Sequence, residues 1–170
     1  MRPRARAVPS VEIVVESPLW KTKRGAKIIL QRAVAAAAAA CRATGELCIV
    51  LTDDAAIRAL NRIWRGLDEP TNVLSFPARK NLPPPPAGEG RGGGVLGDIV
   101  IAYETTTREA LAESKPFPHH LSHLAVHGFL HLLGYDHETD DAAEAMERLE
   151  RAILARLDVP DPYAERHAGS

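Results

Sequence analysis

Six of the seven histidines in this 170-residue chain lie between positions 119 and 137. Two of them, His127 and His131, are four residues apart in an apolar segment that is typical of a helix, residues 120–133. Four residues turn a helix by ~400°, so the two imidazoles lie on one face, about one turn apart. At that spacing both rings can bind one metal ion at ~2.0–2.1 Å.

A glycine and a third histidine follow this helical pair. Gly134 can take the left-handed conformation that ends a helix and reverses the chain, so that His137 completes a triangle of ligands. The whole pattern is H-x3-H-x2-G-x2-H. Three neutral imidazole nitrogens leave a fourth position for water, which is the arrangement of catalytic rather than structural zinc sites. Zinc suits imidazole, but nickel, copper and iron do so as well.

The same spacing occurs in the metzincin peptidases, whose pattern is H-E-x-x-H-x-x-G-x-x-H. Gly128 stands where those enzymes carry the glutamate that acts as general base, which weighs against proteolysis. His123 lies on the same helical stripe, but ~12 Å from position 131 along the axis, which favours a supporting or packing role. His119 and His120 follow a proline and are expected to form only the entrance to the helix.

Hydrophobic patterning and breaker residues predict a single α+β domain over residues 1–170, with a small four-stranded sheet flanked by helices. The strands are expected at residues 11–15, 47–52, 72–76 and 95–102, the last one interrupted at Gly97 and Asp98. The helices are expected at residues 23–43, 55–64, 105–114, 120–133 and 140–157.

Between these elements the composition predicts irregular segments and no membrane association. Prolines followed by glycines make residues 81–94 a flexible loop, and residues 1–8 and 160–170 are expected to be loose tails. The chain has no apolar run of the roughly 18–20 residues that cross a bilayer, and its basic start lacks the apolar core of a secretory signal. Two cysteines are too few for a disulfide framework, which favours a reducing, cytoplasmic location.

The net charge of −1 conceals a strong asymmetry along the chain. Residues 1–32 carry eight Lys and Arg against two acidic residues, whereas residues 137–170 carry four Arg against nine acidic residues. A basic N-terminal face could meet a phosphate backbone, so nucleic acid is one candidate partner. A solvated helix face with a frayed tail explains the same charges without a ligand.

Two long stretches resemble motifs of the YbeY family of bacterial rRNA maturation factors, which are metal-dependent endoribonucleases. One is HGFLHLLGYDH at residues 127–137, and the other is NRIWRGLDEPTNVLSFP at residues 61–77. LGDIVI at residues 96–101 and EAMERLE at residues 144–150 are also similar to the family, so the resemblance spans roughly residues 11–157. The loop at 81–94 and the arginine-rich start depart from it.

The resemblance implies a zincin-like fold with a mixed sheet and one Zn²⁺ held by His127, His131 and His137. It also implies hydrolysis of single-stranded RNA, in maturation of the 3′ end of the small-subunit (16S) rRNA and in ribosome quality control. The implied partners are rRNA and the ribosomal small subunit or its proteins, with no DNA substrate. The functionally important arginine of the family corresponds to Arg65.

The residues themselves leave several readings open. Arg65 can offer a planar fork of donors to a phosphate, or it can end a helix and pair with Asp68 or Glu69. The neighbouring Trp64 is more typical of a core position than of a platform for base stacking. Asp136 and His123 are the candidate proton acceptors, while attack by an RNA 2′-hydroxyl would be a different mechanism.

Two further functions also stay open. One is a metallopeptidase, which the ligand spacing suggests and Gly128 opposes. The other is a ribosome assembly factor in which the metal site is mainly structural and binding is the main function.

Overall fold

The computed structural model describes residues 8–78 and 94–164. The predicted loop at 81–94, apart from Gly94, and the predicted tail at 1–8, apart from Val8, lie outside the described residues. The elements follow one another in the order β1 (Ser10–Val15), a 3-10 turn (Pro18–Thr22), α1 (Ala26–Cys41), β2 (Glu46–Thr52), α2 (Asp54–Arg65), β3 (Val73–Pro77), β4 (Val95–Ala102), α3 (Tyr103–Ala112), α4 (Phe117–Leu132) and α5 (Asp140–Arg156).

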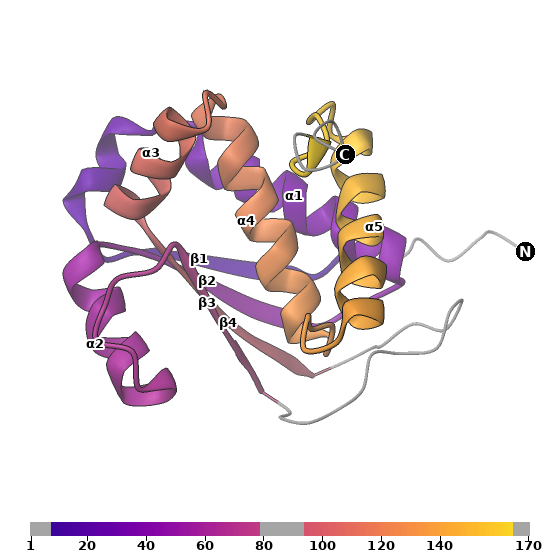
Figure 1. Cartoon of the computed structure of the whole chain (residues 1–170), viewed down its shortest axis with the longest axis horizontal. Coiled ribbons are helices and arrows are strands. Elements are labelled where there is room, and N and C mark those ends of the chain that lie inside the picture. The colour runs from indigo at the N-terminus through magenta and orange to yellow at the C-terminus, as the bar shows by residue number, and fades with distance from the viewer. Residues whose placement is uncertain (1–7, 79–93, 165–170) are drawn as a thin grey trace, which may run out of the picture.

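The four strands form one mixed sheet in the order β1-β2-β4-β3 (Figure 1). β1, β2 and β4 are parallel, and β3 joins the edge beside β4 in the antiparallel direction. The predicted α+β class and the mixed four-stranded sheet are therefore confirmed. Within the described residues, no helix has the length and apolar character needed to cross a bilayer.

Alternate residues of the strands face two different layers of helices. Ile49 and Ile99 belong to the main core, which α1, α4 and α5 complete on one face of the sheet (Figure 1). Val100 and Leu74 point to the other face, where Ile57 of α2 covers them. Because side chains alternate along a strand and helices cover both faces of the sheet, most successive residues of β2 and β4 are apolar.

The predicted helix at 23–43 is wrong at both ends. Before it, Ser17 accepts a hydrogen bond from the backbone N–H of Leu19 and starts a 3-10 turn. That turn is tied to the end of β2, because the indole of Trp20 donates to the carbonyl oxygen of Thr52 at 2.8 Å. At the other end, Arg42 takes the left-handed conformation that ends α1, three residues before Gly45.

The expected interruption of the last strand is a β-bulge rather than a break. Glu46 pairs with Val95 and Leu47 with Gly97, so one residue of β4 has no partner in β2. Gly97 has a φ of 139°, and a Cβ at this position would collide with the backbone carbonyl oxygen of Phe76. A glycine is therefore needed at this bulge between β2 and β4, where the backbone of β4 also approaches β3 closely.

The prediction of a loose tail is wrong for residues 160–164. The carboxylate of Asp161 accepts a 2.8 Å hydrogen bond from the backbone N–H of Tyr163. The Tyr163 hydroxyl donates to the buried carboxylate of Glu150 at 2.7 Å, and Lys115 donates to the carbonyl oxygen of Pro162 at 3.3 Å. These polar contacts fix a short segment that has little apolar area of its own.

Candidate metal centre

The helix α4 carries the candidate site because one of its faces is apolar and the other carries histidines. Leu121, Ala125 and Phe129 are fully buried on the core side. His123, His127 and His131 are half-buried on a second stripe at intervals of four residues. Burial of the apolar face therefore fixes the direction in which the histidine stripe points.

Three imidazole nitrogens converge at the C-terminal end of α4. Nε2 of His131 lies 3.1 Å from Nε2 of His127 and 3.2 Å from Nε2 of His137. One nitrogen carries at most one proton, so hydrogen bonding alone satisfies only one of these two contacts. A cation between the rings would accept all three lone pairs, and tetrahedral ligands at ~2.0–2.1 Å lie about 3.4 Å apart. The three residues fit a metal ion in number, type and spacing.

The turn after α4 brings His137 back to the other two rings. The helix ends at Leu132, and Gly134 has a φ of 100°. The backbone N–H of Tyr135 then donates to the carbonyl oxygen of Leu130 at 3.1 Å, which closes the reversal. Asp136 accepts from the backbone N–H of Glu138 at 3.2 Å and caps this turn. The predicted role of Gly134 is confirmed.

Burial and the two neighbouring imidazoles set the protonation of the central ring. They lower the pKa of His131 to about 4. Burial disfavours the charged form of the ring, and a positive charge on His131 would be repelled by positive charge on His127 or His137. His131 is therefore neutral at pH 7. A neutral imidazole is the form that binds a metal ion.

Glu150 is the main residue of the site that the sequence interpretation missed. It lies on α5, its side chain is fully buried, and its Oε1 is 3.0 Å from Nδ1 of His127. Its position could have revealed it, because Met146, Glu150, Ile153 and Leu154 form the buried stripe of α5. An acidic residue on the apolar stripe of an amphipathic helix requires a partner, and a histidine cluster supplies one.

Two further donors reach the other oxygen of this carboxylate. His123 Nε2 lies 2.8 Å from Oε2 of Glu150, and the Tyr163 hydroxyl lies 2.7 Å from the same oxygen. Burial alone would raise the pKa of Glu150, but the hydrogen bonds from His123 and His127 bring it down to about 2. The predicted supporting role of His123 is consistent with these contacts, and its Nε2 is already engaged.

His120 does more than form the entrance to α4. It is buried, and its Nε2 lies 3.1 Å from Oε1 of Glu109 on α3. The same carboxylate accepts from the amide of Asn72 at 2.8 Å. The three side chains tie α3, α4 and the start of β3 together. They border a cavity of about 510 Å³ whose wall also includes His123 and Tyr163.

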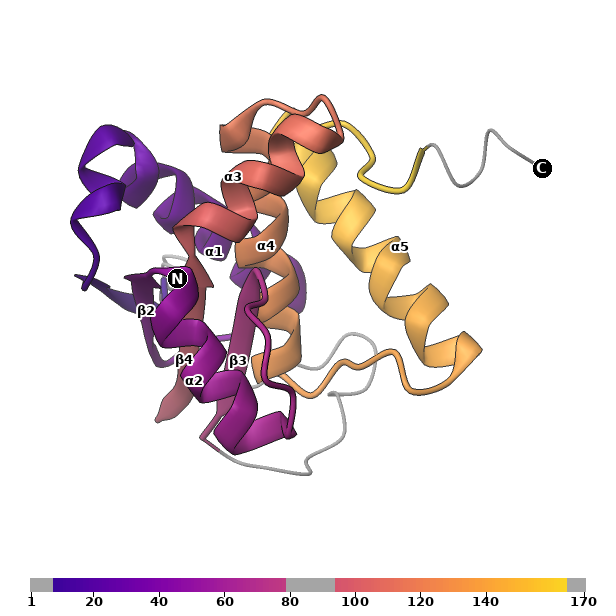
Figure 2. The same cartoon turned by 60° about the vertical axis from the view of Figure 1, so that its left-hand side comes forward.

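Arg65 is exposed at the last position of α2. Asp68, one of its two expected partners, is instead bound by Arg58 at 2.9 Å. Among the described residues, no hydrogen bond or ion pair joins Arg65 to the three histidines. α2 and α4 cover opposite faces of the sheet, and the edge strand β3 contacts both helices. Both helices end toward the lower side of the molecule in Figure 2.

The expectation that Trp64 lies in the core is wrong. Its side chain is 58% exposed, and its ring meets Phe76 of β3 edge-on at a centroid distance of 5.8 Å. Position 64 lies on the same helical stripe as Ile57 and Asn61, so Trp64 faces β3, but it belongs to the last turn of α2 and keeps most of its side chain exposed.

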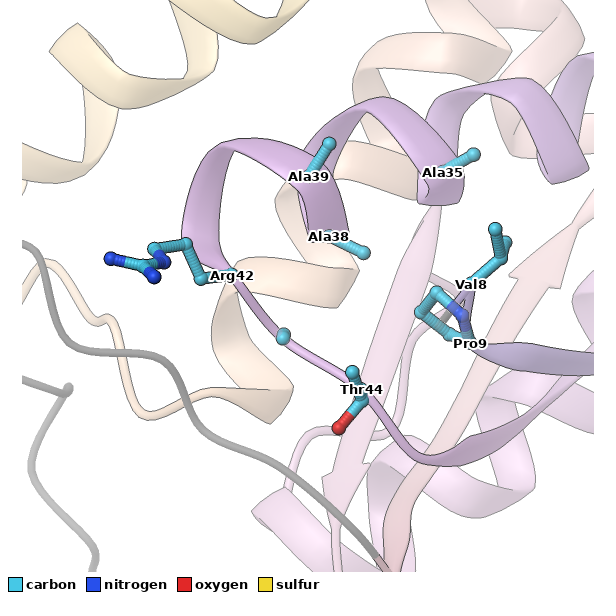
Figure 3. Close-up of a pocket in the computed structure, with 8 residues that line it drawn as sticks. Val8, Pro9, Ala35, Ala38, Ala39, Arg42 and Thr44 are labelled. Carbon is cyan, nitrogen blue, oxygen red and sulfur yellow. The ribbon is translucent and has the colours of Figure 1, made fainter. Parts of the chain in front are cut away.

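A separate hollow on the molecule offers no comparable chemistry (Figure 3). It has a volume of about 230 Å³ and lies between the start of β1 and the C-terminal part of α1. Four alanines of α1 and of the segment after it form half of its wall, and Val8, Pro9, Arg42 and Thr44 form the other half. No metal-ligating side chain lines it.

Fold and site together define an α+β protein with a candidate metal centre of three histidines, on one helix and the turn that follows it. The family model "Endoribonuclease YbeY" matches residues 16–158 of this chain. The chain is 57% identical to the Endoribonuclease YbeY of Rhodopseudomonas palustris, over 93% of this chain and 92% of that protein. It is 56% identical to that of Bradyrhizobium diazoefficiens, over 94% and 87% of the two chains. The chain belongs to the YbeY family.

A solved structure also aligns with this chain. It is the solution structure of TM1509 from Thermotoga maritima, which covers 87% of this chain and 91% of its own length at 22% identity, with a TM-score of 0.46.

Proposed function

We propose that this protein is a metal-dependent endoribonuclease specific for single-stranded RNA, acting in maturation of the 16S rRNA 3′ end and in ribosome quality control. The observation that carries the proposal is the convergence of three imidazole nitrogens in a member of a family named for endoribonuclease activity. In this proposal His127, His131 and His137 hold one Zn²⁺ per chain. The cytoplasm and the ribosomal small subunit are the proposed setting.

The chemistry of the donor set supports a catalytic rather than a structural ion. Three neutral nitrogens leave one coordination position for water. When bound, Zn²⁺ lowers the pKa of such a water toward ~7 and polarises a phosphoryl oxygen. His137 is exposed, so the site is open to a polymer from that side. A buried site closed by four protein ligands would favour the assembly-factor alternative instead.

Arg65 is the proposed contact to the phosphate. Its guanidinium can donate two parallel hydrogen bonds to a phosphoryl oxygen pair and stabilise the charge that develops in the transition state. Because Asp68 is occupied by Arg58, that carboxylate does not compete for Arg65. The adjacent exposed Trp64 offers an aromatic face to a base of the same strand. An RNA that crosses the edge strand β3 would contact both helices.

Cleavage of a fluorescent single-stranded RNA by the wild type, His131→Ala and Arg65→Ala tests the proposal. Matched controls are His119→Ala at the start of α4 and Arg62→Ala on the exposed side of α2. We expect a loss of at least about 100-fold in His131→Ala and Arg65→Ala, and activity near wild type in both controls.

Equal cleavage by the wild type and a folded His131→Ala would reject the ribonuclease proposal. If rRNA processing also survived in cells that carry His131→Ala, the assembly-factor function would be favoured. Hydrolysis of a peptide substrate by the wild type would favour the metallopeptidase.

A further inference from the structure

Glu150 receives three hydrogen-bond donors and has no contact with solvent. Its side chain is 0% exposed, with His127 at Oε1 and both His123 and Tyr163 at Oε2. A carboxylate can only accept hydrogen bonds. Each of these three groups must therefore present its proton to Glu150.

This requirement decides the tautomer of His127. Nδ1 of His127 lies 3.0 Å from Glu150 and must carry the proton. A neutral imidazole has one N–H only, so Nε2 of His127 keeps its lone pair. That lone pair faces Nε2 of His131, 3.1 Å away. The hydrogen bond also fixes the rotation of the ring about its Cβ–Cγ bond.

We propose that Glu150, held in place by Tyr163 and His123, is a positioning residue that fixes His127 in the tautomer and orientation required for metal binding. The inference rests on the proposed metal centre, and it adds the segment after α5 to that centre. Carboxylates that orient metal-bound histidines typically contribute a factor of 10–100 to metal affinity.

Tyr163 makes residues 160–164 part of this arrangement. Its hydroxyl is 2.7 Å from Glu150, and its ring meets the His123 ring edge-on at a centroid distance of 5.5 Å. Asp161 accepts from the backbone N–H of Tyr163 at 2.8 Å and fixes the turn that directs the phenol inward. The segment after α5 thus supports the carboxylate at Oε2, the oxygen that His127 does not contact.

A second ion between His123, His127 and Glu150 is the competing explanation, because their ligand atoms also lie within 4.8 Å of one another. Hydrogen bonds account for these contacts without an ion, since the distances to Glu150 are 2.8 and 3.0 Å and both donors can carry a proton. A second ion would require those protons to leave and the buried carboxylate to be reached from outside. The two explanations differ in metal stoichiometry.

The test uses the full chain, stripped of metal with a chelator and labelled with ¹⁵N-histidine. Two-bond ¹H–¹⁵N correlation spectra report the tautomer of each ring, with His127→Ala to assign the signal of His127. Titration with Zn²⁺ against a competing chelator then gives stoichiometry and affinity. The variants are Glu150→Gln and Tyr163→Phe. Their matched controls are Glu144→Gln, on an exposed face of α5, and Tyr103→Phe, whose hydroxyl contacts Thr22.

We expect the Nδ1–H tautomer of His127 and one Zn²⁺ per chain in the wild type. In Glu150→Gln the amide offers one acceptor oxygen to three donors, so the Nδ1–H population falls and the Zn²⁺ dissociation constant rises 10- to 100-fold. Tyr163→Phe changes both quantities in the same direction by a smaller factor. The two controls match the wild type.

Unchanged tautomer and affinity in a folded Glu150→Gln would overturn the inference, and Tyr163→Phe provides the same test if Glu150→Gln does not fold. Two Zn²⁺ per chain in the wild type and one in Glu150→Gln would also overturn it, in favour of a second ion. A third outcome is that the wild type shows the Nδ1–H tautomer of His127, that Glu150→Gln loses this tautomer, and that the wild type binds no Zn²⁺. This outcome would support the positioning of His127 and reject the metal centre instead.

Discussion

The hydroxyl of Ser75 donates a 2.9 Å hydrogen bond to the carbonyl oxygen of Gly128, which joins the edge strand β3 to the C-terminal half of α4. Gly128 directly follows His127, so this contact holds α4 against the sheet at the level of the candidate metal centre. A Cβ at position 128 would lie 3.0 Å from Cγ2 of Ile99 and 3.1 Å from Oγ of Ser75. The absence of a side chain permits the close approach.

Gly128→Glu is expected to destabilise the protein rather than to create a peptidase. The new carboxylate would be directed at Ile99 and Ser75 in the packed layer between helix and sheet, at a cost of at least about 2 kcal/mol in the free energy of unfolding. Urea unfolding measures this cost. Ala145→Glu, at an exposed position of α5, is the control and should stay within ~0.5 kcal/mol of the wild type. A Gly128→Glu protein of normal stability that hydrolyses peptides would contradict the account.

Substitution of two glycines with positive φ should separate backbone strain from steric collision. Gly66 ends α2 with a φ of 71°, and a Cβ there would meet nothing within 4 Å, so Gly66→Ala should cost about 1–2 kcal/mol. Gly97→Ala adds the collision with the carbonyl oxygen of Phe76 and should cost more than about 3 kcal/mol. Thermal and urea unfolding of both variants give the comparison. Equal losses in the free energy of unfolding for Gly66→Ala and Gly97→Ala would contradict this expectation, because they would mean that the bulge in β4 relaxes to avoid the collision.

The fold and the three histidines were accessible from sequence because they depend on local patterns. Alternating and helical hydrophobic periods predict the elements, and the spacing of His127, His131 and His137 around Gly134 predicts their convergence. The helix boundary at residue 26 was not accessible, because it depends on a contact between Trp20 and the end of β2, more than 30 residues away.

Glu150 and Tyr163 illustrate the same limit within the site. The sequence shows an acidic residue on an apolar stripe and a tyrosine directly after a proline, but not which buried group each of them contacts. That information appears only when α5 packs against α4 and the following segment folds back. Arg65 remains a prediction, since its role depends on a ligand rather than on a contact within the fold.

Glu109 should make stability depend on acid pH. Burial raises the pKa of this carboxyl, but hydrogen bonds from His120 and Asn72 outweigh it, so the pKa in the folded protein is lowered. The pKa of Glu109 is lower in the folded than in the unfolded protein. The ionised carboxylate therefore stabilises the fold above about pH 4.5, and this stabilisation is lost as the pH falls through the pKa of the folded state. Glu109→Gln should therefore flatten the decrease in Tm below that pH. The same decrease in Tm below about pH 4.5 in the wild type and in Glu109→Gln would contradict this role of Glu109.

The two cysteines should differ in reactivity. Burial raises the pKa of Cys41 to about 11, so roughly one molecule in a thousand carries the thiolate at pH 8. Burial and the neighbouring carboxylates of Asp98 and Glu12 also raise the pKa of Cys48, but its side chain is only half-buried. A disulfide reagent should label Cys48 first, and Cys41 only as the protein unfolds. The variant Cys48→Ser reports the labelling rate of Cys41, and Cys41→Ser reports that of Cys48. Faster labelling of Cys41 would contradict its burial in α1.

The most direct test of the metal centre and its proposed activity is a titration of the metal-stripped protein with Zn²⁺, followed by cleavage of single-stranded RNA at each step. The account predicts that activity rises linearly, saturates at one equivalent per chain, and does not rise in a folded His131→Ala variant. Activity that is independent of added Zn²⁺, or equal in the wild type and His131→Ala, would contradict it.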